Sequence, residues 1–323
     1  MGTKKLKFID LFAGIGGTRI GLEQAAEELG CKVECVFTSE INSKSRSTYV
    51  KNFSIEEKCI FQEDITLLDK PSEIKLIPSH DLLLAGFPCQ AFSLAGKRKG
   101  FEDTRGTLFY NIMKVLKYKK PKFFMLENVA NLVKHDKGKT IVTMLKHLRN
   151  EGYEVPEPKI LNAKDFGLPQ NRRRVFIVGS NKKNFKFSYP EKNNVQTKVK
   201  DILEEGKIDS KYTISAKLWQ SHQLRKERNK KNGKGFGYQK VTRDSNYTAT
   251  LSARYYKDGA EILLDRGPKK EPRKLTPREC SNLQGFPKDF ILNKSDNESY
   301  KQFGNSVPVP VVKAICLELL KNL

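Results

Sequence analysis

The sequence has no apolar run approaching the roughly 18 residues that a membrane-spanning helix needs. Its first residues, MGTKKL, lack the apolar core of a secretory signal peptide. Leu6 stands where a myristoylation signal requires serine or threonine. We therefore expect a cytoplasmic protein without a membrane partner.

Cysteines and histidines are few and scattered. The six cysteines include no CxxC pair, and the four histidines are isolated from one another. This spacing gives little support to a zinc site, and a reducing compartment disfavours disulfides. We expect no metal site.

Acidic residues are outnumbered, since 60 lysines and arginines face 37 aspartates and glutamates and leave a formal net charge of +23. A surplus of this size favours a polyanionic partner such as nucleic acid. A generally lysine-rich composition would give the same charge without a partner, so composition alone leaves both interpretations open.

Apolar strand patterns alternate with helical patterns over residues 6–180. We expect strands at 6–12, 32–38, 60–62, 81–85, 123–126 and 174–179, and helices at 18–29, around 49–50, at 108–117 and at 141–149. This alternation predicts an α/β fold with a doubly wound, mostly parallel sheet.

After about Asn181 the sequence becomes lysine-rich and irregular. The elements expected there are a helix at 215–228, short strands at 247–252 and 261–265, and a final helix at 307–320. We expect one domain formed by 1–184 with 290–323, and a smaller, irregular, basic domain formed by 185–289.

The segment FIDLFAGIGG at 8–17 combines a strand, a glycine turn and the start of a helix. Glycines let the backbone approach a ligand closely, and a helix N-terminus favours negative charge. Glu40 and Asp64 end the next two expected strands, where carboxylates can bind a ribose and an adenine amine. The third glycine of the dinucleotide fingerprint is missing, so an adenosyl ligand without pyrophosphate fits better. A tight turn without a ligand is the alternative.

The segment GFPCQ at 86–90 follows an expected strand, so Cys89 lies at the sheet edge where ligands bind. A thiol there is placed for nucleophilic attack, although a buried structural cysteine is the alternative. Glu127 ends another strand and could protonate or hydrogen-bond a ring nitrogen, or simply cap a helix.

Three arginines occur in QNRRR at 170–174. Strand alternation would place Arg172 and Arg174 on the same side, where guanidinium groups suit carbonyl oxygens and phosphates. A solvated run of charges is the alternative.

Taken together, these segments resemble the bacterial DNA (cytosine-5)-methyltransferase family. The matching segments, in the order typical of the family, lie at 8–17, 86–93, 127–129, 170–174, 273–280 and 302–307. Residues 185–270 lack general motifs, as does the variable target-recognition region of that family. The resemblance implies a Rossmann-like S-adenosylmethionine-dependent methyltransferase domain joined to a target-recognition domain.

The resemblance also implies a mechanism. Cys89 would add to C6 of a cytosine flipped out of double-stranded DNA, and C5 would then take the methyl group of S-adenosylmethionine, leaving S-adenosylhomocysteine. Glu127 would hold the N3 and N4 edge of the base. Arg174 would bind O2, with Arg172 beside it supporting a phosphate or the catalytic loop.

Binding residues follow from the same resemblance. The cofactor residues would be Phe12, Gly14, Gly16, Glu40, Asp64, Ile65, Pro88, Asn305 and Ser306. The DNA-contacting residues would be Gln90 together with Ser93, Lys97, Arg98 and Arg105 of the segment 91–107, which would close over the DNA. Cys280 is interpreted as structural.

The segments 235–238 and 250–263 resemble recognition regions of methylases that act on CCWGG or CCNGG sites. Arg254 and Lys257 could read guanines by bidentate donation, or could bind only phosphate.

We expect a monomeric, sequence-specific modification enzyme, either solitary or paired with a restriction endonuclease that acts on the same site without direct contact. A tRNA cytosine-5 methyltransferase of the same fold is one alternative. A catalytically idle DNA-binding relative is another, although it would have lost Cys89, Glu127 or Arg174.

Overall fold

The computed structural model describes residues 5–53, 59–88, 108–193, 195–235 and 237–322. The predicted site residues Cys89, Gln90, Ser93, Lys97, Arg98 and Arg105 lie outside these ranges. The chain divides into two compact units. The first comprises Met1–Leu161, Arg173–Glu191 and Val311–Leu323, and the second comprises Asn162–Arg172 and Lys192–Pro310.

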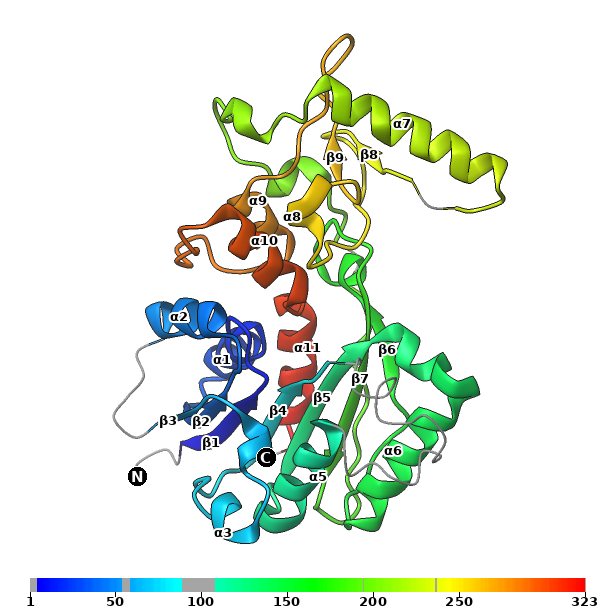
Figure 1. Cartoon of the computed structure of the whole chain (residues 1–323). Coiled ribbons are helices and arrows are strands. Elements are labelled where there is room, and N and C mark those ends of the chain that lie inside the picture. The colour runs from blue at the N-terminus through cyan, green and yellow to red at the C-terminus, as the bar shows by residue number, and fades with distance from the viewer. Residues whose placement is uncertain (1–4, 54–58, 89–107, 194, 236, 323) are drawn as a thin grey trace. The chain divides into compact units, whose positions relative to one another are not determined.

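A seven-stranded sheet with the order β3-β2-β1-β4-β5-β7-β6 forms the centre of the first unit (Figure 1). Its strands are β1 (Leu6–Leu11), β2 (Val33–Ser39), β3 (Ile60–Gln62), β4 (Leu82–Gly86), β5 (Phe123–Val129), β6 (Lys159–Asn162) and β7 (Arg173–Ser180). The strands β1 to β5 pair with one another in parallel, whereas β7 runs antiparallel to β5. The predicted α/β fold with a mostly parallel sheet is confirmed.

Helices cover both faces of this sheet. They are α1 (Gly17–Glu28), α2 (Ser43–Asn52), α3 (Pro71–Ile74), α5 (Leu108–Lys119), α6 (Lys139–Asn150) and α11 (Val309–Leu320), the last of which begins in the second unit. Alternate strand residues such as Leu83, Ala85, Phe124 and Leu126 form one apolar cluster with α5 and α6. Figure 1 shows α5 and α6 on one face and α1 on the other. All strands and helices predicted over 6–180 are present, and the short strand β6 was not predicted.

The second unit has few regular elements. Within the described residues they are the 3-10 turns η4 (Ala163–Phe166), η5 (Val199–Ile202) and η6 (Ser210–Tyr212), followed by α7 (Ala216–Lys231), β8 (Lys240–Val241), α8 (Tyr255–Asp258), β9 (Leu263–Leu264), α9 (Pro277–Leu283) and α10 (Asp296–Asn305). The helix predicted at 215–228 and the strand predicted at 261–265 are confirmed by α7 and β9.

The strand predicted at 247–252 is wrong. Thr248 makes only an isolated bridge with Gln170. Its amide donates to the Pro169 carbonyl, and the Leu251 amide donates to the Gln170 side chain. Backbone groups of this segment therefore bond to residues 169–172 and to the Gln239 side chain rather than to a partner strand.

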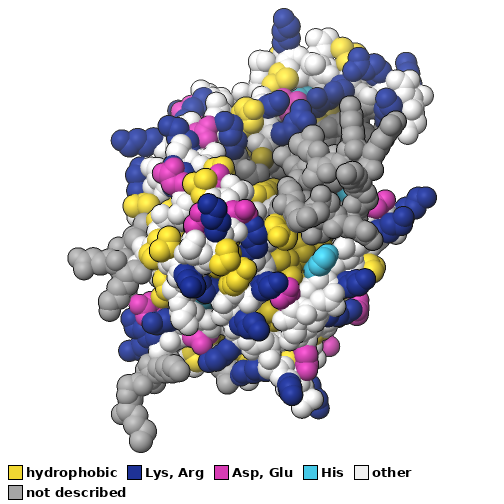
Figure 2. Space-filling view, turned by 60° about the horizontal axis from the view of Figure 1, so that its bottom comes forward, with side chains coloured by type: hydrophobic (Ala, Val, Ile, Leu, Met, Phe, Trp, Pro, Cys, Tyr) yellow, Lys and Arg dark blue, Asp and Glu magenta, His cyan; other side chains and the backbone are white. Residues whose placement is uncertain are grey.

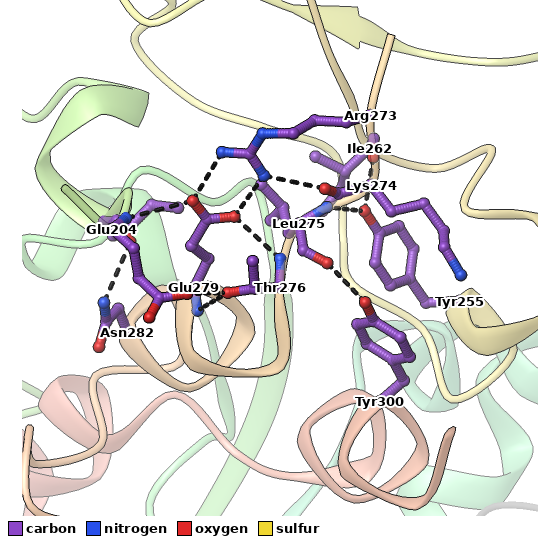
Figure 3. Close-up of polar contacts among 11 residues, drawn as sticks. Glu204, Tyr255, Ile262, Arg273, Lys274, Leu275, Thr276, Glu279, Asn282 and Tyr300 are labelled. Atoms are coloured by element: carbon purple, nitrogen blue, oxygen red, sulfur yellow. Dashed lines mark hydrogen bonds and ion pairs between the residues drawn. The ribbon is translucent and has the colours of Figure 1, made fainter. Parts of the chain in front are cut away.

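A buried polar network organises the interior of the second unit (Figure 3). The Arg273 guanidinium donates to both oxygens of Glu279, at 2.7 Å each. The Tyr255 hydroxyl donates to the Ile262 carbonyl and accepts from the Leu275 amide. Next to Glu279 in the chain, Cys280 is fully buried, and burial raises the pKa of its thiol well above the ordinary value. These contacts agree with a structural role for this segment.

One stretch of the described residues, Asp296–Leu320, is long enough to pass for a membrane-spanning helix and contains an 18-residue window with a mean hydropathy of 1.4. The prediction from continuous apolar runs missed it because polar residues interrupt the stretch. However, 61% of this window is buried inside the protein, as in the core helices of soluble proteins. On its own it is weak evidence for a membrane.

Candidate active site

Most of the predicted site residues of the first unit gather at one edge of its sheet. Leu11 of β1 pairs with Ser39 of β2 and with Ala85 of β4, and Ser39 pairs with Gln62 of β3, so these strands end together. We call this edge the carboxyl edge, which is where open α/β sheets bind ligands. Because β7 is antiparallel, its first residues lie at the carboxyl edge as well.

The turn after β1 has the geometry of a ligand-binding loop. Phe12 and Gly14 both have φ of 57° and Gly16 has φ of 87°, values that favour glycine. A Cβ added at Gly14 would meet no atom within 4 Å, so this backbone is open to close approach. A Cβ at Gly16 would lie only 2.2 Å from Cε2 of Phe53, so this glycine is also required by packing.

Two carboxylates follow β2 and β3, as predicted. Glu40 accepts hydrogen bonds from the Gly14 amide and the Asn42 amide, both at 2.8 Å. Asp64 accepts from the Thr66 amide at 2.8 Å, and Ile65 beside it is buried. A carboxylate has about four acceptor positions, so Glu40 retains capacity for a ribose hydroxyl while it holds the glycine turn.

These features fit an adenosyl amino acid. No side chain of the described residues caps the N-terminus of α1, so its first amides can face a ligand carboxylate. The Glu40 carboxylate reaches this turn from the end of β2 and accepts from the Gly14 amide, next to the open backbone. Asn305 and Ser306 end α10 in the second unit, so their part in this site remains a prediction.

Asp10 is a buried polar residue that the sequence analysis missed. Its Oδ1 accepts from the Thr18 hydroxyl at 2.7 Å, whereas its Oδ2 has no hydrogen-bond partner within the described part of the chain. Burial raises the pKa of this carboxyl to about 7, against the opposing effect of the Thr18 hydrogen bond. The available signal was a carboxylate inside an otherwise apolar strand, directly before the glycine turn.

Glu127 and Arg174 form a buried ion pair at the carboxyl edge. The Arg174 Nε lies 3.0 Å from the Glu127 Oε1, and their side chains are 13% and 9% exposed. The Glu127 Oε2 lies 3.5 Å from the position that a Cβ of Gly86 would take, so the missing side chain leaves room for this carboxylate at the end of β4. Burial lowers the pKa of Arg174 against the opposing effect of Glu127, but the guanidinium stays protonated.

Asn128 is a second residue that the sequence analysis missed, although its motif was noticed. Its Nδ2 donates to the Phe87 carbonyl at 2.8 Å, and its Oδ1 accepts from the Val129 amide. The side chain is buried and fastens β5 to the segment that leads into Cys89. Pro88, the last described residue before Cys89, is exposed.

Arg172 belongs to the second unit and has different partners from Arg174. Its guanidinium donates to the carbonyls of Leu251 at 2.7 Å, Gly304 at 2.9 Å and Ser306. The side chain is 1% exposed. These contacts tie the QNRRR motif to the motif that contains Asn305 and Ser306, and the predicted role toward substrate remains a prediction.

The predicted base-reading residues lie on the surface of the second unit. Arg254 precedes α8 and Lys257 lies within it, and both are exposed. Their helix is held by Tyr255, which is fully buried. Among the described residues, no group of three or more His, Cys, Asp or Glu side chains could hold a metal ion.

The sheet order, the glycine turn and the carboxylates at the carboxyl edge define a Rossmann-like methyltransferase fold. The family model described as C-5 cytosine-specific DNA methylase matches residues 6–321. The chain therefore belongs to the C5 cytosine-specific DNA methylase family and is a DNA (cytosine-5) methyltransferase.

Curated relatives match over almost the whole chain. The Type II methyltransferase M1.ScrFI of Lactococcus lactis subsp. cremoris is 53% identical, over 99% of this chain and 79% of its own length. The Type II methyltransferase M.NlaX of Neisseria lactamica is 51% identical, over 97% of this chain and 96% of its own length.

Solved structures show the same fold at low sequence identity. The S. pombe Dnmt2 methyltransferase matches with a TM-score of 0.78 and 22% identity, over 99% of both chains. A putative DNA modification methyltransferase of an E. coli prophage matches with a TM-score of 0.70 and 22% identity, over 98% of this chain and 99% of its own.

Proposed function

We propose that this chain transfers a methyl group from S-adenosylmethionine to C5 of a cytosine flipped out of double-stranded DNA, through a covalent bond between Cys89 and C6. The buried Glu127–Arg174 pair beside Gly86 is the observation that carries the proposal. The pair lies beside the end of β4, the strand that precedes Cys89 in the sequence, and this supports roles for Glu127 at a ring nitrogen and for Arg174 at a carbonyl oxygen of the base.

The proposed reaction has three steps, which are addition of Cys89 to C6, methyl transfer to C5, and elimination of Cys89. The Cys89 thiolate adds to C6, and the electrons of the C5–C6 double bond make C5 nucleophilic. Glu127 hydrogen-bonds the N3 and N4 edge and stabilises the protonated ring, while Arg174 offsets charge at O2. C5 forms its bond to the methyl group. Loss of the C5 proton to a base not yet assigned then expels Cys89 and restores the double bond.

S-adenosylmethionine, when bound, would supply the methyl group and leave as S-adenosylhomocysteine. Gly14 would allow the close approach of this ligand, Glu40 would accept from its ribose, and Asp64 with Ile65 would hold its adenine. The fit of the glycine turn supports this assignment. Phe12, Gly16, Pro88, Asn305 and Ser306 complete the proposed site.

The relatives named Type II methyltransferases support a setting in restriction and modification. We place the enzyme in the cytoplasm as a monomer that acts on a specific duplex sequence. Residues 185–289 would form its target-recognition domain, and most of them fall in the second unit. A partner endonuclease would cut the same site without touching this chain.

Transfer of tritiated methyl groups from S-adenosylmethionine to plasmid DNA tests this proposal. Cys89→Ser should abolish transfer while DNA binding survives, and Glu127→Gln should lower kcat by about 10²- to 10⁴-fold through loss of acid catalysis. Cys31→Ser, at an exposed cysteine, is the matched control and should keep full activity. Full activity of Cys89→Ser would refute the covalent step.

A duplex containing 5-fluorocytosine should trap a covalent complex at Cys89, because fluorine at C5 blocks the final elimination. The tritiated methyl-transfer assay, repeated with tRNA in place of plasmid DNA, tests the alternative substrate. Transfer to tRNA but not to duplex DNA would overturn the proposal. Bisulfite sequencing of DNA from cells that express the chain would then identify the methylated cytosine.

A further inference from the structure

We propose that the outward side of α7 binds the phosphate backbone of the DNA duplex on which the enzyme acts. This inference rests on the proposed function and adds a binding surface to it. The surface, here called the α7 basic face, consists of Lys217, Arg228 and Lys231 together with Leu224, which lies on the same side of the helix.

Helix α7 is not a core helix. Only His222 of its 16 residues is buried. With 3.6 residues per turn, Lys217, Leu224, Arg228 and Lys231 all lie on the side opposite His222. Their side chains are exposed, so packing within the unit does not explain why this side is basic. Figure 1 shows α7 at the margin of its unit, with β8 and β9 to one side.

The charged side chains of α7 are almost all positive. Its sequence, AKLWQSHQLRKERNKK, holds six lysines and arginines and a single acid, Glu227. At 1.5 Å per residue the α7 basic face extends over about 21 Å. That length spans about six phosphates of one DNA strand, which are 3.4 Å apart along the axis.

The inner side of α7 is fixed to α8. The Arg225 guanidinium donates to the Asp258 carboxylate at 3.2 Å and to the Nδ1 of His222 at 3.1 Å. Because an arginine can only donate, Nδ1 is the acceptor and the Nε2–H of His222 donates to the Asp258 carbonyl, at 3.2 Å. Asp258 is thus paired with Arg225 on the inner side of α7 and does not neutralise the positive charge of the α7 basic face.

This attachment links the α7 basic face to the predicted base-reading residues. Arg254 and Lys257 flank Tyr255 on the short helix that ends at Asp258. Burial would raise the pKa of Asp258, but the Ala260 amide and Arg225 outweigh it and the pKa is lowered, so the linking charge persists. Phosphate contacts on α7 would therefore fix the position of α8 on the duplex.

A duplex fits this surface better than a single strand or an apolar partner. Single strands are bound by aromatic side chains on which bases stack. The aromatic residues here are engaged elsewhere, since the rings of Trp219 and Tyr238 are 4.7 Å apart and Lys226 lies over Tyr238. Leu224 is the one large exposed hydrophobic side chain on the described helix, too little for an apolar interface.

The experiment compares two triple variants with the same charge change. Lys217→Gln, Arg228→Gln and Lys231→Gln neutralise the α7 basic face. The control variant neutralises three exposed lysines on α5 and α6 of the first unit, as Lys117→Gln, Lys139→Gln and Lys146→Gln. For each protein, Kd is measured from 50 to 300 mM salt with a labelled, unmethylated duplex that contains the enzyme's target sequence. The kcat for methyl transfer is measured at saturating DNA.

Each phosphate contact contributes about 0.9 to the slope of log affinity against log salt concentration. The magnitude of this slope should therefore fall by up to about 2.7 in the α7 variant, and by less than about 0.9 in the control variant. The ratio of Kd for the cognate duplex to Kd for a duplex with an altered site should not change, and kcat at saturation should match the wild type.

Two results would overturn the inference while leaving the proposed function intact. The first is methylation of DNA by the wild type with equal salt slopes for both variants. The second is a loss of sequence discrimination in the α7 variant, which would mean that α7 reads bases rather than phosphates. A wild-type chain that neither binds nor methylates duplex DNA would overturn both proposals together.

Discussion

Replacing Glu279 with glutamine should strongly destabilise the second unit, because it removes the charge opposite a buried arginine (Figure 3). The Arg273 and Glu279 side chains are 9% and 0% exposed, and two hydrogen bonds of 2.7 Å join them. The Glu279 carboxylate also accepts from the Thr276 amide at 2.9 Å and from the Glu204 amide at 3.2 Å. Glutamine keeps the volume but leaves the guanidinium uncompensated.

Breaking a buried pair of this kind costs about 3–5 kcal/mol. With a urea m-value of about 3 kcal/mol per M, the unfolding midpoint should fall by about 1–1.7 M. The chain contains one tryptophan, and Trp219 lies in the second unit against Tyr238, so its fluorescence follows the unfolding of that unit.

The matched control is Glu298→Gln. Glu298 pairs with Lys301 at 2.6 Å, but these side chains are 23% and 40% exposed, so the loss should stay below about 1 kcal/mol. If Glu279→Gln proves too unstable to purify, Arg273→Met with Glu279→Gln removes both charges, keeps a side-chain acceptor for the Thr276 and Glu204 amides, and should be more stable than Glu279→Gln alone. Equal midpoints for Glu279→Gln and Glu298→Gln would refute the reasoning.

Three further changes test other parts of the structure. Asp10→Asn should flatten the dependence of stability on pH between about pH 4 and 7. A carboxyl whose pKa is raised on folding to about 7 binds its proton more tightly in the folded state, so wild-type stability falls as pH rises through this window; identical urea midpoints against pH for both proteins would contradict this. Gly304→Ala should cost about 1–3 kcal/mol in the Trp219 assay, because the new Cβ would lie 2.3 Å from the Ser252 backbone, whereas Gly235→Ala meets nothing within 4 Å and should be neutral. Arg172→Lys should lower the urea midpoint as well, since one ammonium cannot match a guanidinium fork bound to three carbonyls; an unchanged midpoint would show that these bonds contribute little.

The strands were predictable wherever burial makes them continuously apolar. The segments LLLAG of β4 and FFMLENV of β5 lie in the middle of the sheet, so their sequence shows their position directly. The strand β6, with the sequence KILN, has polar ends and lies at the sheet edge, which explains why it was missed. The segment 247–252 has the composition of a strand, but its backbone groups bond to residues 169–172 and to the Gln239 side chain.

The candidate site was predictable to the extent that motifs mark it. The motifs of Glu127 and Arg174 predicted that both side chains serve the same site. Their direct ion pair depends on the antiparallel direction of β7, which the sequence pattern does not reveal. The partners of Arg172 were not predictable, because they are backbone carbonyls of residues 79 to 134 positions away. Asn128 was missed for the same reason, since its role depends on the carbonyl of Phe87, 41 positions away and directly after β4.

The division of the first unit into three chain segments has a consequence for synthesis. Its sheet is complete once residue 191 has been made, yet Val312 of α11 packs so closely on α1 that a Cβ at Gly21 would lie 2.6 Å from its Cγ1. The ribosome must therefore add roughly 120 further residues before α1 can be covered, which takes on the order of 6–24 s at bacterial rates. During that interval an apolar helix face stays uncovered on the nascent chain, and this is the stage at which a chaperone would find its binding site.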